Sequence, residues 1–253
     1  MKDRFNLEGK VAVVTGASKG IGEAIARGLA ELGAKLVVSS RKQEAVDRVV
    51  SALKRDRLEA TAISCHVGHV DQLENLVDRT IETYGGVDIL VNNAATNPVV
   101  GPITETDSGA FDKIIGVNLK APFELAKMVY PIMQERGGGS IVNISSIGGL
   151  RPEPMLGIYS VSKAALISLT KVLAMEWGSD KIRVNAICPG LIKTDFSRVL
   201  WENEKFLKRF EEEIPLGRMA TSDEVAPLAV FLASDVSSYC TGSTYTVDGG
   251  YTT

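Results

Sequence analysis

The chain has 253 residues, of which 45% are hydrophobic and 23% are charged, and its formal net charge is −3. This composition is ordinary for a globular protein and argues against a disordered, collagenous or coiled-coil chain. The slightly acidic balance gives no electrostatic reason to expect nucleic acid or an anionic membrane as a partner.

Short apolar segments alternate with longer stretches of helical periodicity. Seven candidate strands, rich in Val and Ile, lie at residues 11–15, 36–39, 60–65, 89–91, 140–144, 183–187 and 243–247. Their weak polar alternation is typical of strands covered on both faces. Helical patterns occupy residues 22–32, 70–84, 111–134 and 160–176. The alternation predicts one doubly wound α/β domain over residues 1–253, a Rossmann fold with a seven-stranded parallel sheet flanked by helices.

A glycine-rich turn follows the first predicted strand. Gly16, Gly20 and Gly22 have the spacing G-x-x-x-G-x-G, and a helix pattern comes directly after them. Glycines let the backbone approach a pyrophosphate, which then meets the free N–H groups of the helix N-terminus. A strand–helix turn that is glycine-rich without a ligand is the alternative. The position after the first strand of an alternating chain favours the dinucleotide site.

The end of the second predicted strand favours NADP over NAD. An acidic residue at this place would bind both ribose hydroxyls of NAD, but the sequence has Ser40 and Arg41. Serine leaves room for a 2′-phosphate, and the arginine offers it a charged fork. Lys19 in the glycine-rich turn is a second candidate for this phosphate. A solvated basic loop is the alternative interpretation.

The fifth predicted strand leads into a serine, a tyrosine and a lysine. Tyr159 lies thirteen residues after Ser146, and Lys163 lies four residues further on. A helix places this tyrosine and lysine about one turn apart on one face. A lysine cation near the phenol is expected to lower its pKa by at most about 3 units, towards neutral pH. An ordinary helix-surface pair is the alternative, and hydrolase motifs are lacking.

The cysteines and the N-terminal residues indicate a cytoplasmic protein without a metal site. Cys65, Cys188 and Cys240 are scattered and odd in number, which is not a disulfide framework. No C-x-x-C occurs and there are only two histidines, so no zinc site is expected. The first ten residues are too charged for a signal peptide, and no run of 18 apolar residues predicts a membrane span.

A segment near the C-terminus is predicted to cover the substrate. Residues 195–213 have helical periodicity and an unusual density of aromatic side chains, and we expect them to form a lid. Packing of this helix on the core is the alternative, and the two are compatible. Residues 147–155 are expected to form the second wall. The pocket is expected to be apolar, with Arg151 as its one further cationic candidate, which disfavours a small carboxylate substrate.

Six motifs follow one another along the chain. They are Thr15-Gly16-x-x-x-Gly20-x-Gly22, Asn92-Asn93-Ala94-Ala95, Asn118, Ser146, Tyr159-x-x-x-Lys163 and Pro189-Gly190-x-x-x-Thr194. In this order and spacing they resemble the short-chain dehydrogenases/reductases over essentially the whole length of the chain. The resemblance implies direct hydride transfer between nicotinamide C4 and a substrate carbon.

The resemblance also implies a role for each catalytic residue. Tyr159 would be the general acid or base, and Lys163 would lower its pKa and bind the nicotinamide ribose. Ser146 would orient the carbonyl or alcohol. Asn118 would hold a water that relays protons through Lys163.

Further positions follow from the same resemblance. The expected cofactor-binding residues are Gly16, Ser18, Lys19, Gly20, Ile21, Gly22, Ser40, Arg41, His66, Val67, Asn93, Ala94, Tyr159, Lys163, Pro189, Gly190, Ile192 and Thr194. The expected substrate residues are Ser146, Ile147, Met155, Tyr159, Phe196, Leu200 and Trp201. Two positions depart from the family pattern, because Ala95 replaces a motif glycine and His66 replaces a frequent adenine-binding aspartate.

Within the family, the segments 39–43, 65–68, 93–98 and 189–197 are similar to those of animal NADP-dependent carbonyl and retinal reductases. That subgroup reduces ketones, α-dicarbonyls and retinal. The family resemblance also implies a homotetramer, built on residues 111–134, 160–176 and the C-terminal strand.

The sequence therefore predicts a cytoplasmic NADP(H)-dependent carbonyl reductase or alcohol dehydrogenase acting on a hydrophobic ketone, dicarbonyl or secondary alcohol. One alternative is reduction of 3-oxoacyl thioesters, although the acidic chain lacks an evident basic patch for a carrier protein. The other is a non-catalytic NADP-binding protein, which the presence of the serine, tyrosine and lysine disfavours.

Overall fold

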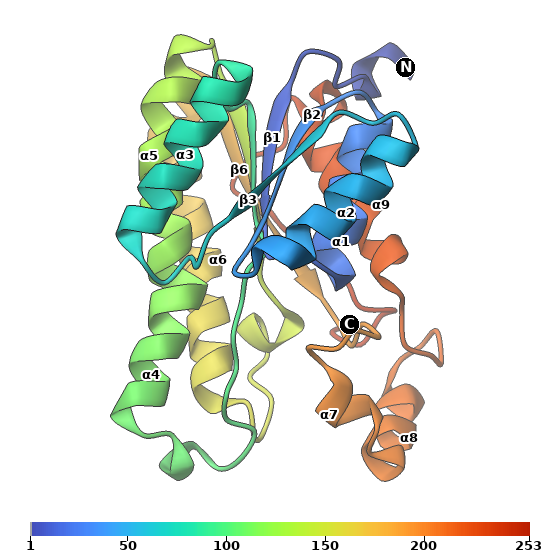
Figure 1. The fold of residues 1–253 in the computed structure, drawn as a ribbon. Coiled ribbons are helices and arrows are strands. Elements are labelled where there is room, and N and C mark those ends of the chain that lie inside the picture. Colours follow the sequence, from blue (N-terminus) through green and yellow to red (C-terminus); the bar gives the residue numbers. More distant parts are fainter. Residues whose placement is uncertain (1) are drawn as a thin grey trace.

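The computed structural model describes residues 2–253 and is organised around one parallel sheet (Figure 1). The sheet has the strand order β3-β2-β1-β4-β5-β6-β7. Its strands are β1 (Val11–Thr15), β2 (Lys35–Ser40), β3 (Ala60–Ser64), β4 (Ile89–Asn92), β5 (Gly139–Ile144), β6 (Ile182–Pro189) and β7 (Thr244–Val247). All neighbouring pairs are parallel, which confirms the predicted doubly wound α/β fold.

Helices cover both faces of this sheet (Figure 1). One face carries α1 (Gly20–Glu31), α2 (Gln43–Arg55) and α9 (Ser222–Ala233). The other carries α3 (Val70–Tyr84), α4 (Ser108–Ile115), α5 (Ala121–Glu135) and α6 (Gly157–Trp177). Two helices, α7 (Arg198–Trp201) and α8 (Glu204–Glu213), lie apart from these layers beyond the end of β6.

Two helices are absent from the predicted set. The sequence carries a signal for α2, because its buried Val46, Val49, Val50 and Leu53 have helical spacing. The signal for α9 is weaker, since this helix is apolar on several sides and contains Pro227.

The long helix predicted over residues 111–134 is interrupted. The structure has α4, then a π turn at Gly116–Lys120, and then α5. Turns of this kind insert an extra residue into the helical ladder and are frequent at functional sites. The hydrophobic periodicity continues through the π turn, so the sequence pattern does not predict the interruption.

Helix α6 is the one helix within residues 2–253 whose length and hydropathy match a membrane span, over the stretch Gly157–Asp180. In the fold it is a layer of the domain, because it packs against β6 and against the short turn Ile147–Gly149. A buried chain of hydrogen bonds fixes it to the sheet. Asn92 Nδ2 donates to Asn143 Oδ1 at 2.9 Å, and Asn143 Nδ2 donates to Thr170 Oγ1 at 2.9 Å.

Candidate active site

A cavity of about 1160 Å³ opens at the carboxyl ends of the strands. This is where ligands bind in open α/β sheets. The predicted site residues that line it are Gly16, Ser18, Lys19, Gly20, Ile21, Ser40, Arg41, His66, Val67, Asn93, Ala94, Ser146, Ile147, Met155, Tyr159, Lys163, Pro189, Gly190, Ile192, Thr194, Phe196 and Leu200. Three predicted residues, Gly22, Asn118 and Trp201, are not part of the lining.

The glycine-rich turn has no room for a side chain at Gly16 or Gly22. Gly16 and Gly20 have φ of +64° and +63°, in the left-handed region that favours glycine. A Cβ on Gly22 would lie 2.4 Å from Asn93 Nδ2. That amide donates to Thr15 O at 3.0 Å and to Gly16 O at 3.1 Å, so it holds the turn open from the neighbouring strand. The result is a bare backbone cradle at the N-terminus of α1, which fits a pyrophosphate.

Basic side chains line the end of the cavity next to the glycine-rich turn and β2. Ser18 Oγ donates to Ser40 Oγ at 3.1 Å and ties the glycine-rich turn to the end of β2. Arg41 lines the cavity, is exposed, and forms no ion pair with any residue that the structure describes. Lys19 is engaged elsewhere, because its Nζ donates to Asp195 Oδ2 at 2.8 Å. This ion pair links the glycine-rich turn to the segment after β6. Lys19 is therefore not free to bind a 2′-phosphate in this structure.

His66 stands beside this basic end. Its Nδ1 accepts from the Gly68 N–H at 3.1 Å, and its ring meets that of His69 edge-on at 4.7 Å. Burial lowers the pKa of His66, and His69 and Arg41 act in the same direction. A neutral imidazole is therefore the form that faces the cavity. Lys113 of α4 also lines this end, and no motif marks it in the sequence.

The predicted serine, tyrosine and lysine are brought together. Ser146 follows β5, and its Oγ accepts from the Gly148 N–H at 3.1 Å. Tyr159 and Lys163 lie on α6, with Lys163 Nζ at 5.7 Å from the Tyr159 ring centroid. Gly149 lets the serine turn sit directly on this helix, since a Cβ there would lie 2.7 Å from the Lys163 carbonyl carbon.

The pKa of the tyrosine differs from the sequence-based expectation. Burial raises the pKa of Tyr159 to about 12, and the Ser146 hydroxyl acts in the opposite direction. Burial also lowers the pKa of Lys163 to about 8. The Lys163 ammonium donates to Ile144 O at 2.8 Å. The Coulomb argument from sequence left out desolvation, and desolvation dominates for both groups.

Asn118 lies in the π turn, which packs against α6. Its side chain is fully buried, and its Oδ1 accepts from the Thr96 N–H at 2.8 Å. Its Nδ2 donates to Thr96 O and to Ser162 Oγ, each at 3.0 Å. The amide is therefore committed to the protein, so the side chain of Asn118 is not available to hold a water.

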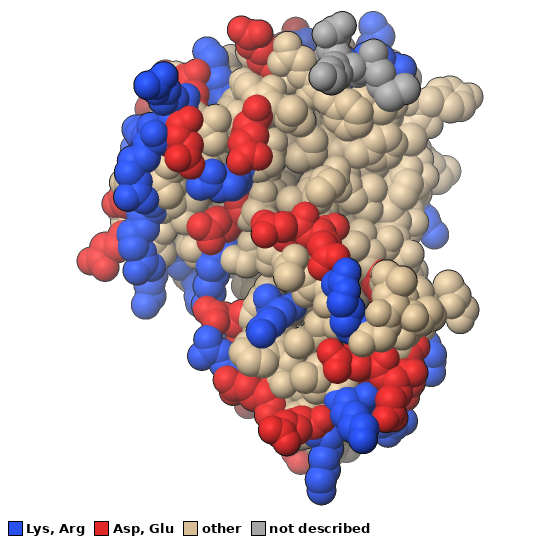
Figure 2. All heavy atoms as spheres, turned by 90° about the vertical axis from the view of Figure 1, so that its right-hand side faces the viewer, with Lys and Arg blue, Asp and Glu red and all other residues tan. Residues whose placement is uncertain are grey.

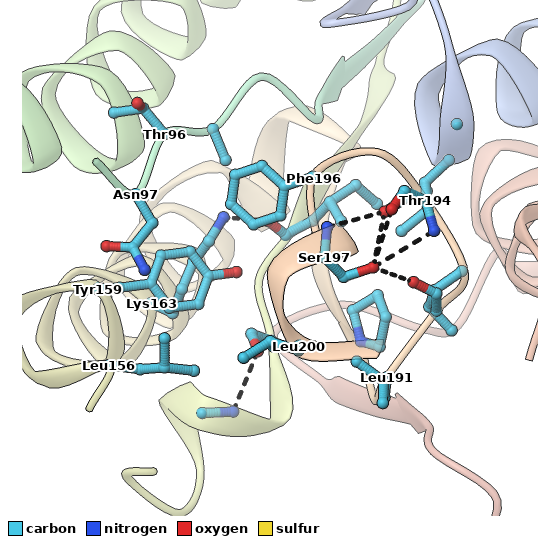
Figure 3. Close-up of a pocket in the computed structure, with 18 of the residues that line it drawn as sticks. Thr96, Asn97, Leu156, Tyr159, Lys163, Leu191, Thr194, Phe196, Ser197 and Leu200 are labelled. Carbon is cyan, nitrogen blue, oxygen red and sulfur yellow. Dashed lines mark hydrogen bonds between the residues drawn. The ribbon is translucent and has the colours of Figure 1, made fainter. Parts of the chain in front are cut away.

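The substrate end surrounds Tyr159 with apolar side chains. Figure 3 shows Phe196, Leu156 and Leu200 around the tyrosine, and the Phe196 and Tyr159 ring centroids lie 6.0 Å apart. Trp201 is not in this wall. Its Nε1 donates to Thr194 O at 2.9 Å, so it braces the segment from outside.

The cavity also has polar lining that sequence reasoning missed. Asn97 points toward Tyr159 in Figure 3. Glu153, Arg209 and Tyr251 line the same cavity further along. Tyr251 is close to the C-terminus, and no periodicity or motif indicates that it returns to the site.

A family model described as enoyl-(acyl carrier protein) reductase matches residues 16–252. Among curated proteins, the chain is 48% identical over 247 residues to dehydrogenase/reductase SDR family member 4 of Sus scrofa, covering 98% of this chain and 88% of that protein. The protein of the same name from Homo sapiens is 46% identical over 250 residues, covering 99% and 90%.

Two solved structures superpose on the chain over nearly its whole length. A gluconate 5-dehydrogenase from Burkholderia cenocepacia J2315, in complex with NADP and tartrate, superposes with a TM-score of 0.95 at 33% identity, covering 99% of this chain and 98% of that one. A short-chain type dehydrogenase/reductase from Mycobacterium marinum gives a TM-score of 0.93 at 36% identity, with coverages of 99% and 98%.

Proposed function

The chain belongs to the short-chain dehydrogenase/reductase family and is an oxidoreductase that uses a nicotinamide cofactor, and we propose that it is an NADP(H)-dependent reductase of hydrophobic ketones or dicarbonyls, or a dehydrogenase of the matching secondary alcohols. The observation that carries the proposal is the placement of Tyr159, Lys163 and Ser146 in one cavity with the glycine cradle. A proton donor and a dinucleotide site thus share one space.

The protein's own groups handle the proton. With its pKa raised to about 12, Tyr159 is a neutral phenol near pH 7 and can donate its proton to the oxygen of a carbonyl that is being reduced. Ser146, beside it, orients that oxygen. Lys163, with a pKa of about 8, can return a proton to the tyrosine, and a water on the Asn118 main-chain carbonyl would connect it to solvent. The nicotinamide, when bound, supplies or takes the hydride.

The preference for NADP rests on Arg41. It lines the adenosine end, and Ser40 beside it brings no negative charge that would repel a 2′-phosphate. A charge-assisted hydrogen bond to phosphate contributes roughly 1.5–3 kcal/mol.

The apolar surroundings of Tyr159 support a hydrophobic substrate. Residues 195–213 supply Phe196, Leu200, Phe206 and Phe210 to the lining, and we assign this segment as the lid. The Lys19–Asp195 ion pair connects it to the cofactor turn. Closure over the substrate would exclude water from the reacting carbon.

We also propose a homotetramer. The outer sides of α5 and α6 expose Phe123, Val161, Val172 and Met175, the last with 85% of its surface accessible. Exposed apolar side chains that gather in a patch often mark an interface. A second face carries α9, which has no charge beyond its first turn, and Figure 2 shows a broad uncharged area on that side. The first interface is tested by measuring the mass of the wild type and of Met175→Glu by light scattering. If the interface exists, the variant should form a smaller assembly.

The proposed location is the cytoplasm. The three cysteines are free thiols in the structure, and Cys65 and Cys188 are buried, which suits a reducing compartment. Fractionation of cells that express the full-length protein tests this assignment.

The experiment that tests the proposed function is turnover of NADPH and NADH with aliphatic ketones, aryl ketones, an α-diketone and a 3-oxoacyl thioester. We expect NADPH-dependent reduction of the simple carbonyls. The description of the matched family model keeps acyl thioesters as the second candidate, and activity confined to the thioester would select it. Tight NADPH binding without any turnover would select the non-catalytic alternative.

A further inference from the structure

The cavity wall contains two polar side chains, Glu153 and Tyr251, beyond the apolar side chains that surround Tyr159. Tyr251 is buried and stacks on Phe210 of α8, with ring centroids 4.5 Å apart and planes 17° from parallel. The Glu153 carboxylate lies next to it and lines the same cavity. Burial, and after it this carboxylate, raise the pKa of Tyr251 to about 12, so its hydroxyl keeps its proton.

The backbone around Glu153 forms a hydrogen-bonded turn. Its carbonyl accepts from the Leu156 N–H at 3.2 Å, which closes a turn with Pro154 at the second position and Met155 at the third. Met155 has φ of +69°, a region that this turn position reserves mainly for glycine. Strain of this kind clusters at ligand sites. The turn is also tied down from outside, because the Gly101 N–H donates to Met155 O at 3.0 Å.

The Glu153 carboxylate has unused hydrogen-bonding capacity. Its Oε1 is covered from solvent and has no hydrogen-bond partner among the residues that the structure describes. Two arginines of this region, Arg209 and Arg151, have other partners. Arg209 pairs with Glu213 at 3.2 Å, and the Arg151 guanidinium lies over the Tyr251 ring at 5.9 Å.

We propose that Glu153 and Tyr251 form a substrate subsite that binds a hydrogen-bond-donating group, a hydroxyl or an amine, at the end of the substrate remote from the reacting carbon. The inference rests on the proposed function and narrows its substrate class to ketones or alcohols with an apolar body and a distal donor. A hydrogen-bond donor on the substrate would pair with the carboxylate oxygen. Leaving a buried carboxylate oxygen without a partner is energetically costly. A distal carboxylate on the substrate would instead meet a like charge.

The test uses methyl ketones of increasing chain length, each with and without a hydroxyl on the last carbon. In the wild type, kcat/KM should favour the hydroxylated member of one chain length by about ten- to hundredfold, the worth of a hydrogen bond to a charged group. In Glu153→Leu this ratio of the hydroxylated to the plain ketone should fall to about one. Glu153→Gln, which keeps the size and a neutral acceptor, should fall between the two.

Tyr251→Phe is the matched variant, because it keeps the ring stacked on Phe210 and removes only the hydroxyl. We expect a smaller loss of the hydroxyl preference than in Glu153→Leu. If no chain length shows a preference in the wild type, or if Glu153→Leu keeps it, the subsite is wrong. Failure of the wild type to reduce the plain ketones would instead contradict the proposed function, so the two failures are distinct.

Discussion

The two ends of the cavity are built from different kinds of structure. The proposed cofactor and catalytic end combines the ends of buried strands with α6 and the π turn, and Asn118 there is fully buried while Lys163 is 2% exposed. The substrate end consists of a loop and short helices, where Met155 and Phe196 are half exposed. The first end fixes the chemistry through backbone fit and buried hydrogen bonds. The loop and short helices of the substrate end are held by a few contacts, such as the Lys19–Asp195 ion pair. Their side chains can therefore be substituted without disturbing the residues that carry out the chemistry.

The largest effect is expected at Tyr159, the proposed proton donor. Tyr159→Phe removes the proton donor and keeps the ring, so kcat should fall about 10²–10⁴-fold while NADPH binds as before. Steady-state rates and fluorescence titration of NADPH measure the two quantities. Near-normal turnover would remove Tyr159 from the mechanism.

Cofactor choice is the next test of the proposed cofactor end. Arg41→Ala should lower kcat/KM for NADPH about ten- to hundredfold, with little change for NADH, because one charge-assisted hydrogen bond is lost. Lys19→Ala is the control: since this lysine pairs with Asp195, its effect on the NADPH/NADH ratio should be smaller. Equal use of both cofactors by the wild type would contradict the assignment of Arg41.

The fit of the glycine-rich turn gives a third test. Gly22→Ala places a methyl group 2.4 Å from Asn93 Nδ2 and 2.6 Å from Gly16 O, and overpacking of this kind costs about 1–3 kcal/mol. The dissociation constant of NADPH should rise by about tenfold or more. Gly178→Ala is the matched control, because a Cβ there meets nothing within 4 Å. Comparable losses in both variants would argue against a specific cradle.

The buried lysine predicts a pH-dependent stability. Because its pKa falls from 10.5 to about 8 on folding, the unfolded chain binds more protons between these pH values, and stability rises with pH across that window. Lys163→Met lacks this term. Its melting temperature should exceed that of the wild type by a few degrees at pH 7, and the difference should shrink towards pH 10.5. A constant difference over this range would show that Lys163 keeps an ordinary pKa.

The smallest effect is expected at the edge of the lid. Trp201→Phe removes the hydrogen bond to Thr194 O, worth about 0.5–1.5 kcal/mol, and should raise KM about two- to tenfold for small and large ketones alike. Leu200→Ala, a change in the lining itself, should instead alter KM according to substrate size. If the effect of Trp201→Phe on KM depends on substrate size, Trp201 lines the pocket after all.

The same contrast explains what the sequence can predict. Gly16 and Gly20 adopt left-handed backbone conformations, and Tyr159 and Lys163 share one face of a helix, so local patterns reveal them. The parallel sheet follows from uninterrupted apolar strands. These features depend on neighbours in the sequence or on the period of a regular element.

The remainder depends on contacts between distant segments. Nothing near Glu153 in the sequence indicates that Tyr251 will lie beside it, and the pairing of Lys19 with Asp195 joins residues 176 positions apart. The direction of the Tyr159 pKa shift likewise depends on burial, which only the assembled fold determines. Trp201 was predicted to line the pocket because aromatic density does not tell which side of a helix faces the ligand.

The most direct test of the account is isotope transfer. The protein is incubated with a simple aryl ketone and NADPH that carries deuterium on both C4 positions, and the product alcohol is analysed by mass spectrometry. The account predicts one deuterium on the carbinol carbon, and none at that carbon when the reaction is run with unlabelled NADPH in D₂O. An alcohol without label from the cofactor, or with solvent deuterium on that carbon, would contradict direct hydride transfer in this cavity.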